Sequence, residues 1–243
     1  MKRLLSIPVV TFISLISSIS FASEGQLYVK AEVGAALLQK TRDKILDIKM
    51  TPLFGGDVNL GVGYYLTNNV RADLTFGFTN PRLEGSSTNT STRTYNVLGV
   101  EKTIDAPITL KRTHRGQITS VLVNSYVDLN TDANSPSVFV GAGVGMAQIK
   151  EKITTGEVLG RDAPTAANFV PLQKHSSVTR KANNFAYQLI AGVSVSLNEK
   201  ARIDVAYILA DYGQTKFSKC NDVEINKTSY RTHNIIAGLR FDI

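Results

Sequence analysis

Apolar and polar residues alternate with a period of two along most of the chain, which predicts β-strands with one apolar face. The pattern is clearest at the C-terminus, where every second residue of 235–243 is apolar and the intervening residues are mostly polar or small. A soluble sandwich and a transmembrane barrel would both produce it. The alternation predicts eight strands, at about 27–37, 54–65, 70–79, 117–129, 138–149, 185–196, 201–212 and 233–243.

The connections between these predicted strands alternate between short and long. Those after the second, fourth and sixth strands are short turns, whereas the others span 39–53, 80–116, 151–182 and 213–230. This order places every long connection at one end of an antiparallel sheet, as in outer-membrane barrels, and a soluble sandwich has no reason to sort its loops in this way. We therefore predict an all-β fold, an eight-stranded antiparallel transmembrane β-barrel with short periplasmic turns and four long extracellular loops.

The N-terminus predicts export. Residues 1–3 carry two cations, residues 4–19 are mostly apolar, and small residues follow at 20–22. This order is typical of a secretory signal, so we assign 1–22 to a signal peptide and 23–243 to the barrel domain. Removing Lys2 and Arg3 changes the formal net charge from +7 to +5. The single cysteine, Cys220, excludes an intramolecular disulfide.

A barrel in lipid must satisfy its backbone groups internally, and eight strands leave a lumen that side chains can fill. The presumptive inner face carries charges of both signs, which we expect to pair as a hydrogen-bonded network. These residues are Lys30, Glu32, Asp57, Arg71, Asp73, Asp128, Arg202, Asp204 and Arg240. Inward glycines leave room for the long side chains. We expect a plugged or narrowly wet interior and no wide channel.

The alternative is a soluble eight-stranded barrel, which would bury the apolar face around a ligand. A cavity lined instead with Arg, Asp and Gly would bind an apolar ligand poorly, so this alternative is less favoured.

Motifs for catalysis or cofactor binding are not evident in the sequence. The three histidines, His114, His175 and His233, lack metal-ligand or triad spacing. The alternating glycines of 141–145 indicate packing within a strand. We therefore expect no enzyme, no metal or other cofactor and no nucleic-acid partner. An outer-membrane enzyme stays open as an alternative, because a long connection could bring His114 or His175 near a carboxylate.

All four long connections are net positive. Cations outnumber anions by four to two in 39–53, six to three in 80–116, six to three in 150–182 and four to two in 213–231. This excess favours attraction to polyanionic glycans or acidic host proteins, with salt screening over about 8–10 Å; contact with the phosphates of outer-membrane lipid is the other interpretation. The candidate partner-binding residues are Lys40, Arg42, Lys44, Lys111, Arg112, Arg115, Lys174, Arg180 and Lys181.

Several strand segments carry a resemblance to a known family. Residues 70–75, 120–128, 184–189 and 233–242 resemble the surface adhesins of rickettsiae, small outer-membrane barrels related to opacity and OmpA-like barrels. The resemblance covers nearly the whole chain after the signal, although Ile243 replaces the usual terminal aromatic residue. It implies attachment to host cells, binding of host serum proteins such as vitronectin, and no catalytic residues.

We therefore expect a monomeric bacterial outer-membrane protein with its loops at the cell surface, acting as an adhesin toward host surface or serum proteins. A structural barrel without a specific host partner is the competing interpretation.

Overall fold

The computed structural model describes residues 25–39, 42–43, 48–97, 100–129, 136–159, 175–215 and 228–243. The predicted signal peptide, 1–22, lies outside them. No helix in the described part of the chain is long and apolar enough to cross a membrane. The strands are β1 (Leu27–Leu38), β2 (Arg42–Asp43), β3 (Ile48–Lys49), β4 (Thr51–Leu53), β5 (Gly55–Tyr65), β6 (Val70–Thr79), β7 (Arg82–Val97), β8 (Val100–Asp128), β9 (Ser137–Leu159), β10 (His175–Ser196), β11 (Ala201–Thr215) and β12 (Thr228–Asp242).

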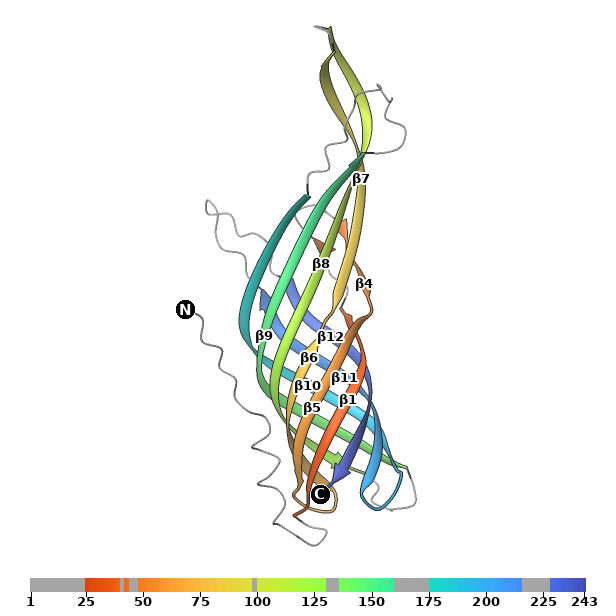
Figure 1. Cartoon of the computed structure of the whole chain (residues 1–243), viewed down its shortest axis with the longest axis vertical. Coiled ribbons are helices and arrows are strands. Elements are labelled where there is room, and N and C mark those ends of the chain that lie inside the picture. The colour runs from red at the N-terminus through yellow and green to blue at the C-terminus, as the bar shows by residue number, and fades with distance from the viewer. Residues whose placement is uncertain are drawn as a thin grey trace, which may run out of the picture.

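Eight of these strands close into an antiparallel barrel, as the sequence predicted (Figure 1). Their order around the wall is β1, β5, β6, β8, β9, β10, β11 and β12, and β12 pairs back onto β1. Each barrel strand therefore has a hydrogen-bonded neighbour on both sides. Closure leaves no strand edge in the wall, which is the condition for crossing hydrocarbon as a sheet.

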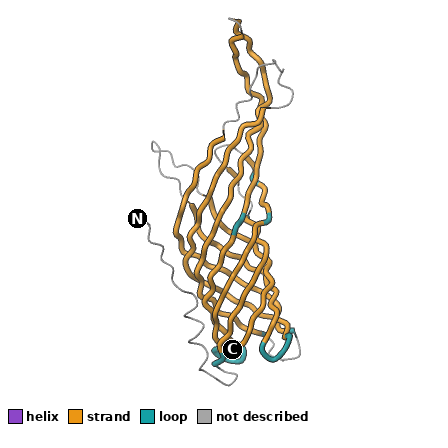
Figure 2. The backbone as a smooth tube through the Cα atoms, in the orientation of Figure 1, coloured by secondary structure: helices purple, strands orange, loops and turns teal. Residues whose placement is uncertain are grey.

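Short turns and the C-terminus lie together at one end of the barrel, at the bottom of the view (Figure 2). In the turn after β5, the Thr67 hydroxyl accepts a hydrogen bond from the backbone N–H of Val70 at 3.0 Å. In the turn after β10, the Asn198 side-chain carbonyl accepts one from the N–H of Ala201 at 2.8 Å. Ser, Thr and Asn favour such turns because their side chains bond to backbone groups two or three residues later.

The outer face of the barrel is an apolar band. The side chains of Leu60, Phe76 and Leu189 remain 57%, 52% and 56% exposed. The other exposed apolar residues of the wall include Val33, Val58, Val62, Leu74, Phe78, Val121, Val123, Val127, Val138, Val140, Val144, Met146, Phe185, Val193, Val195, Ile203, Val205, Ile235, Leu239 and Phe241. Such a band is the surface that a lipid bilayer covers.

Glycines on the inner face make space for long polar side chains. A Cβ at Gly143 would overlap the Asn124 amide, and one at Gly63 would overlap the Tyr28 ring. A Cβ at Gly61 would lie 2.8 Å from Lys30 Cε. The large inward side chains of one strand therefore occupy the volume that glycine leaves on the next.

The wall continues as β-sheet beyond the apolar band, where the sequence predicted loops at 80–116 and 151–182. β7 pairs with the first half of β8 from Arg82–Arg115 to Val97–Val100, forming the tall hairpin at the top of Figure 1. The strand propensity was present in the sequence, because 87–110 is rich in threonine. Apolar residues alternate over 104–110, but the residues of 86–94 that pair with this stretch are all polar, so the hairpin was not predicted.

Candidate functional site

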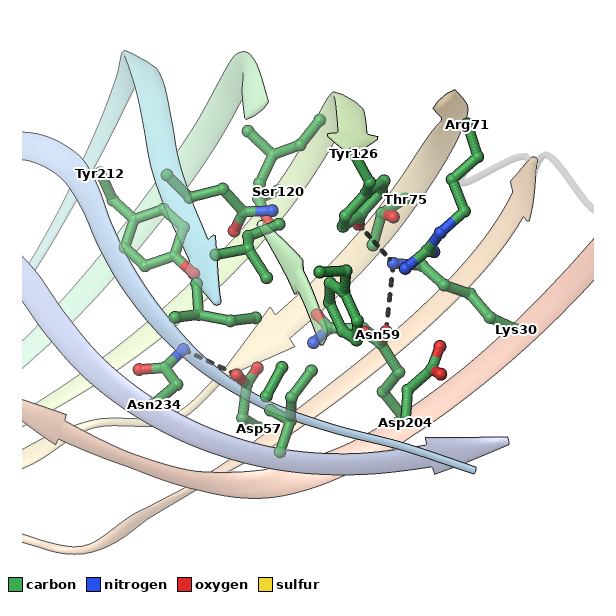
Figure 3. Close-up of a pocket in the computed structure, with 18 residues that line it drawn as sticks. Lys30, Asp57, Asn59, Arg71, Thr75, Ser120, Tyr126, Asp204, Tyr212 and Asn234 are labelled. Carbon is green, nitrogen blue, oxygen red and sulfur yellow. Dashed lines mark hydrogen bonds and ion pairs between the residues drawn. The ribbon is translucent and has the colours of Figure 1, made fainter. Parts of the chain in front are cut away.

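Lys30 is the centre of the polar network inside the barrel. Its ammonium lies 2.9 Å from the Asp73 carboxylate and 3.1 Å from that of Glu32, and it donates to the Tyr126 hydroxyl at 2.9 Å. Figure 3 shows Lys30 and Tyr126 turned toward one another across the lumen. Asn124 donates to Asp73 at 2.7 Å, so each buried charge has several partners.

Two arginines fill the lumen nearer the short turns. Arg71 lies 3.1 Å from the Asp128 carboxylate, and its guanidinium stacks 4.2 Å from the centre of the Tyr126 ring. Arg240 pairs with Asp204 at 3.3 Å and donates to the Ser194 hydroxyl at 2.9 Å. Planar guanidinium groups suit these positions because they combine ion pairs with stacking on aromatic faces.

Asp57 lies farther toward the long connections and is held by neutral donors. Asn234 donates to it at 2.7 Å, as Figure 3 shows, and Thr79 donates at 3.0 Å. Of the nine residues that the sequence assigned to the lumen, Arg202 is half-buried and the other eight are buried.

Apolar side chains were not predicted inside, yet they close much of the lumen. Leu122, Phe139, Ile190, Ile208 and Ile236 are buried and line the same cavity as Lys30 and Asp57. The cavity volume is about 10 Å³, which is enough for about one water molecule. The interior is therefore a packed plug, and its residues hold the wall together.

A second buried cluster lies at the mouth, above the apolar band. Glu151 accepts hydrogen bonds from His114 Nδ1 and from the Thr215 hydroxyl, both at 2.9 Å, and Arg180 lies 3.8 Å away. Burial disfavours the charged form of Glu151, but the hydrogen bonds from His114 and Thr215 outweigh it and hold the carboxyl pKa below its usual range. The cluster ties together four strands at the base of the hairpin.

The enzyme alternative required a histidine close to a carboxylate, and this cluster does bring His114 beside Glu151. His114, Glu151 and Thr215 are each more than nine-tenths buried, however, so a substrate does not reach them. Among the described residues, no group of three His, Cys, Asp or Glu side chains is placed to hold a metal ion. We therefore interpret this cluster as structural.

The basic residues predicted to bind a partner divide into three groups. Lys111, Arg115 and Lys181 are exposed. Arg112 is buried and Arg180 is half-buried beside Glu151, so neither guanidinium is fully exposed as expected of a residue in a solvated loop. Both lie on inward-facing positions of strands that the sequence suggested were loops. Lys40, Lys44 and Lys174 lie outside the described residues, and Arg42 is described only through its backbone.

Two exposed cations on β9, Lys150 and Lys152, were missed as candidates. They flank Glu151, and β-strand alternation turns both of them outward while Glu151 faces the interior. Extending the alternation of 138–149 by three residues would have found them.

Comparison with known proteins agrees with this architecture. Residues 9–241 match the model of the outer membrane protein beta-barrel domain. A Rickettsia felis protein named as a candidate adhesin is 34% identical over 253 residues, covering both chains completely, and a Rickettsia typhi protein with a similar name is 33% identical over 252 residues, again covering both.

Two solved structures also align along most of the chain. Neisserial surface protein A is 14% identical with a TM-score of 0.44, covering 89% of this chain and 97% of its own. Ail, the attachment invasion locus protein of Yersinia pestis, is 13% identical with a TM-score of 0.45, covering 90% and 99%. Because the family model spans nearly the whole sequence, the chain belongs to the outer membrane protein beta-barrel domain family and is a protein of the bacterial outer membrane.

Proposed function

We propose that this protein is an adhesin that binds host-cell or host serum proteins through the part of the sheet that projects from the membrane. The carrying observation is the length of β8, which contains 29 residues. About 9–11 residues suffice to cross a bilayer. The remaining residues, at roughly 3.3 Å each, add about 60 Å of strand beyond the hydrocarbon. A structural barrel needs no such projection.

The projecting sheet is braced by its neighbours rather than being a free loop. β9 stays paired with β8 up to Ile108–Leu159, and β4 pairs with the base of β7 through Leu53–Arg82. Buried residues such as Leu83 and Ile118 pack beneath it. A braced hairpin loses little conformational entropy when it binds, which supports a recognition role.

Charge supports the same proposal. All four long connections are net positive, and Lys111 is exposed on the hairpin. Acidic patches on host proteins or sulfated glycans are the complementary surfaces, and their attraction would weaken with salt. Rickettsial relatives named as candidate adhesins share the whole chain length. Vitronectin, the serum protein linked with that family, is the first partner to test.

The test removes the hairpin while keeping the barrel. Ser86 and Lys111 are cross-strand partners, so replacing 87–110 by Asn-Gly closes the strands with a two-residue turn and preserves the register below. Bacteria displaying each form would be measured for attachment to cultured host cells and to immobilised vitronectin at two salt concentrations. We expect attachment to fall to the level of bacteria without the protein.

Two controls accompany this experiment. Heat-modified gel mobility shows whether the shortened barrel folds, and a hairpin of equal length with Lys102 and Lys111 replaced by glutamine separates charge from reach. Normal attachment by the folded, shortened barrel would instead support a structural barrel without a specific host partner. Turnover of lipid or peptide by the purified protein would favour an enzyme.

A further inference from the structure

Four exposed cations form a patch on the outer face of the wall, just above the apolar band. Arg115 lies on β8, Lys150 and Lys152 on β9, and Lys181 on β10. We call these four residues the basic patch. They come from three adjacent strands and from separate parts of the sequence, so only the folded sheet brings them together.

Strand register places the patch residues directly opposite one another. Arg115 is the cross-strand partner of Lys152, and Lys150 is the partner of Lys181. Arg82 on β7 continues the first row as the partner of Arg115. Cross-strand partners have Cβ atoms about 4.5–5.5 Å apart, and like charges at that spacing destabilise a sheet. The wall therefore holds charges that a bound anion would relieve.

The nearby carboxylate does not neutralise the patch. Glu151 lies between Lys150 and Lys152 in the sequence, but the strand pleat turns it inward to His114, Thr215 and Arg180. Within the described part of the chain, no carboxylate forms an ion pair with any of the four patch cations. The pleat thus separates the charges, with the anion inside and the cations outside.

The height of the patch matches the headgroup layer of a membrane. On the outer face of β9, the exposed apolar residue Met146 is followed by Gln148, Lys150 and Lys152. At about 3.4 Å per residue along a strand tilted by about 40°, the Lys150 Cα lies roughly 10 Å above that of Met146. A lysine side chain can reach back toward the membrane, so its ammonium falls in the polar layer, which is about 5–8 Å thick.

We propose that the basic patch binds the phosphate groups of the outer-leaflet lipid. Phosphate complements clustered ammonium and guanidinium groups, and at this height it is supplied by the headgroups that surround the barrel. Bound phosphate neutralises the two like-charged rows and anchors the β8–β9–β10 side of the wall at a fixed depth. This site lies below residues 87–110, the part of the hairpin that the host-attachment test removes.

The experiment titrates folded protein in zwitterionic detergent with lipid A carrying its two phosphates, and follows binding by native mass spectrometry. The variants are Lys150→Gln/Lys152→Gln, Arg115→Gln/Lys181→Gln and all four together. Each cation near an anionic surface accounts for about a fivefold change in binding, so we expect the fourfold variant to bind at least about tenfold more weakly. Dephosphorylated lipid A should bind the wild type as weakly as that variant.

Matched controls keep the charge or move the change elsewhere. Lys150→Arg/Lys152→Arg should bind like the wild type, and so should Lys200→Gln, in the short turn at the opposite end. Equal binding of lipid A by all variants overturns the proposal. The proposal is also overturned if the fourfold variant binds lipid A normally but no longer binds heparin, because the patch would then bind a host glycan. Host-cell attachment, measured separately, should survive Lys150→Gln/Lys152→Gln, whose residues are not among the candidates for partner binding, so failure of one proposal is distinguishable from failure of the other.

Discussion

Replacing Leu60 by arginine tests which face of the sheet meets hydrocarbon. Leu60 lies near the middle of β5, its side chain is 57% exposed on the outer face, and its cross-strand partners are Ala31 and Phe76. In a bilayer these exposed surfaces contact lipid tails. In a soluble barrel the same surfaces would contact water, and an exposed arginine there would be harmless.

The expected magnitude follows from depth in the bilayer. Arginine on the lipid face of a barrel costs about 2–4 kcal/mol at the midplane and about 0–1 kcal/mol near the interface. Leu60→Arg should therefore reduce the free energy of unfolding by about 2–4 kcal/mol, a factor of about 30 to 1,000 in the folding equilibrium. Asn68→Arg, in the exposed turn after β5, is the matched control and should cost less than about 1 kcal/mol.

The assay is reversible urea unfolding of the protein refolded into phosphatidylcholine vesicles. The sequence contains no tryptophan, so circular dichroism and gel mobility are the suitable signals. A loss for Leu60→Arg within about 0.5 kcal/mol, which is typical of water-exposed surface substitutions, would refute the reasoning. Equal losses for Leu60→Arg and Asn68→Arg would do the same.

Three further predictions concern the interior and the mouth. Lys30→Met leaves the Glu32 and Asp73 carboxylates buried without their cation and should cost about 3–5 kcal/mol in the same urea assay; adding Glu32→Gln and Asp73→Asn should restore most of it, and no restoration would contradict the pairing. Because the folded pKa of Glu151 is lowered, its stabilisation is present above the ordinary pKa of about 4.3 and is lost as pH falls through the folded value. Hydrogen-exchange protection factors of the mouth strands, corrected for the intrinsic exchange rate at each pH, should therefore fall on acidification in the wild type but not in Glu151→Gln; matching profiles would be contrary evidence. Planar bilayers containing the protein should show no large stable pores, because the enclosed cavity is only about 10 Å³; steady conductance steps would show that the plug opens.

The strands inside the membrane were predictable because lipid imposes one rule on every residue of the wall. Outward side chains must be apolar. The predicted range of β6 therefore equals the observed one, Val70–Thr79, and the predicted ranges of β5 and β1 each differ from the observed ones by one residue at one end. The same residue pattern gave the count of eight strands, and the alternation of short and long connections placed all the long ones at one end of the sheet. Both signals are local in the chain, and reading them needs no knowledge of which strands meet.

Above the lipid that rule ends, and the extension of β8 to Val100 was missed because the alternation at 104–110 is short and pairs with a polar stretch. Whether an individual cation is exposed also depends on whether its segment forms a strand. Lys111 and Arg112 are neighbours in the sequence, yet the pleat exposes Lys111 and buries Arg112.

Partners across the sheet were decided only by the tertiary structure. The sequence placed Lys30 and Asp73 on the inner face but could not join them, and it gave no reason to place Lys152 beside Arg115. Contacts of this kind depend on the register and closure of the barrel, which set distances between residues far apart in the chain. Alternation predicts which side of the wall each side chain lies on. Only the closed sheet determines which residues lie opposite one another.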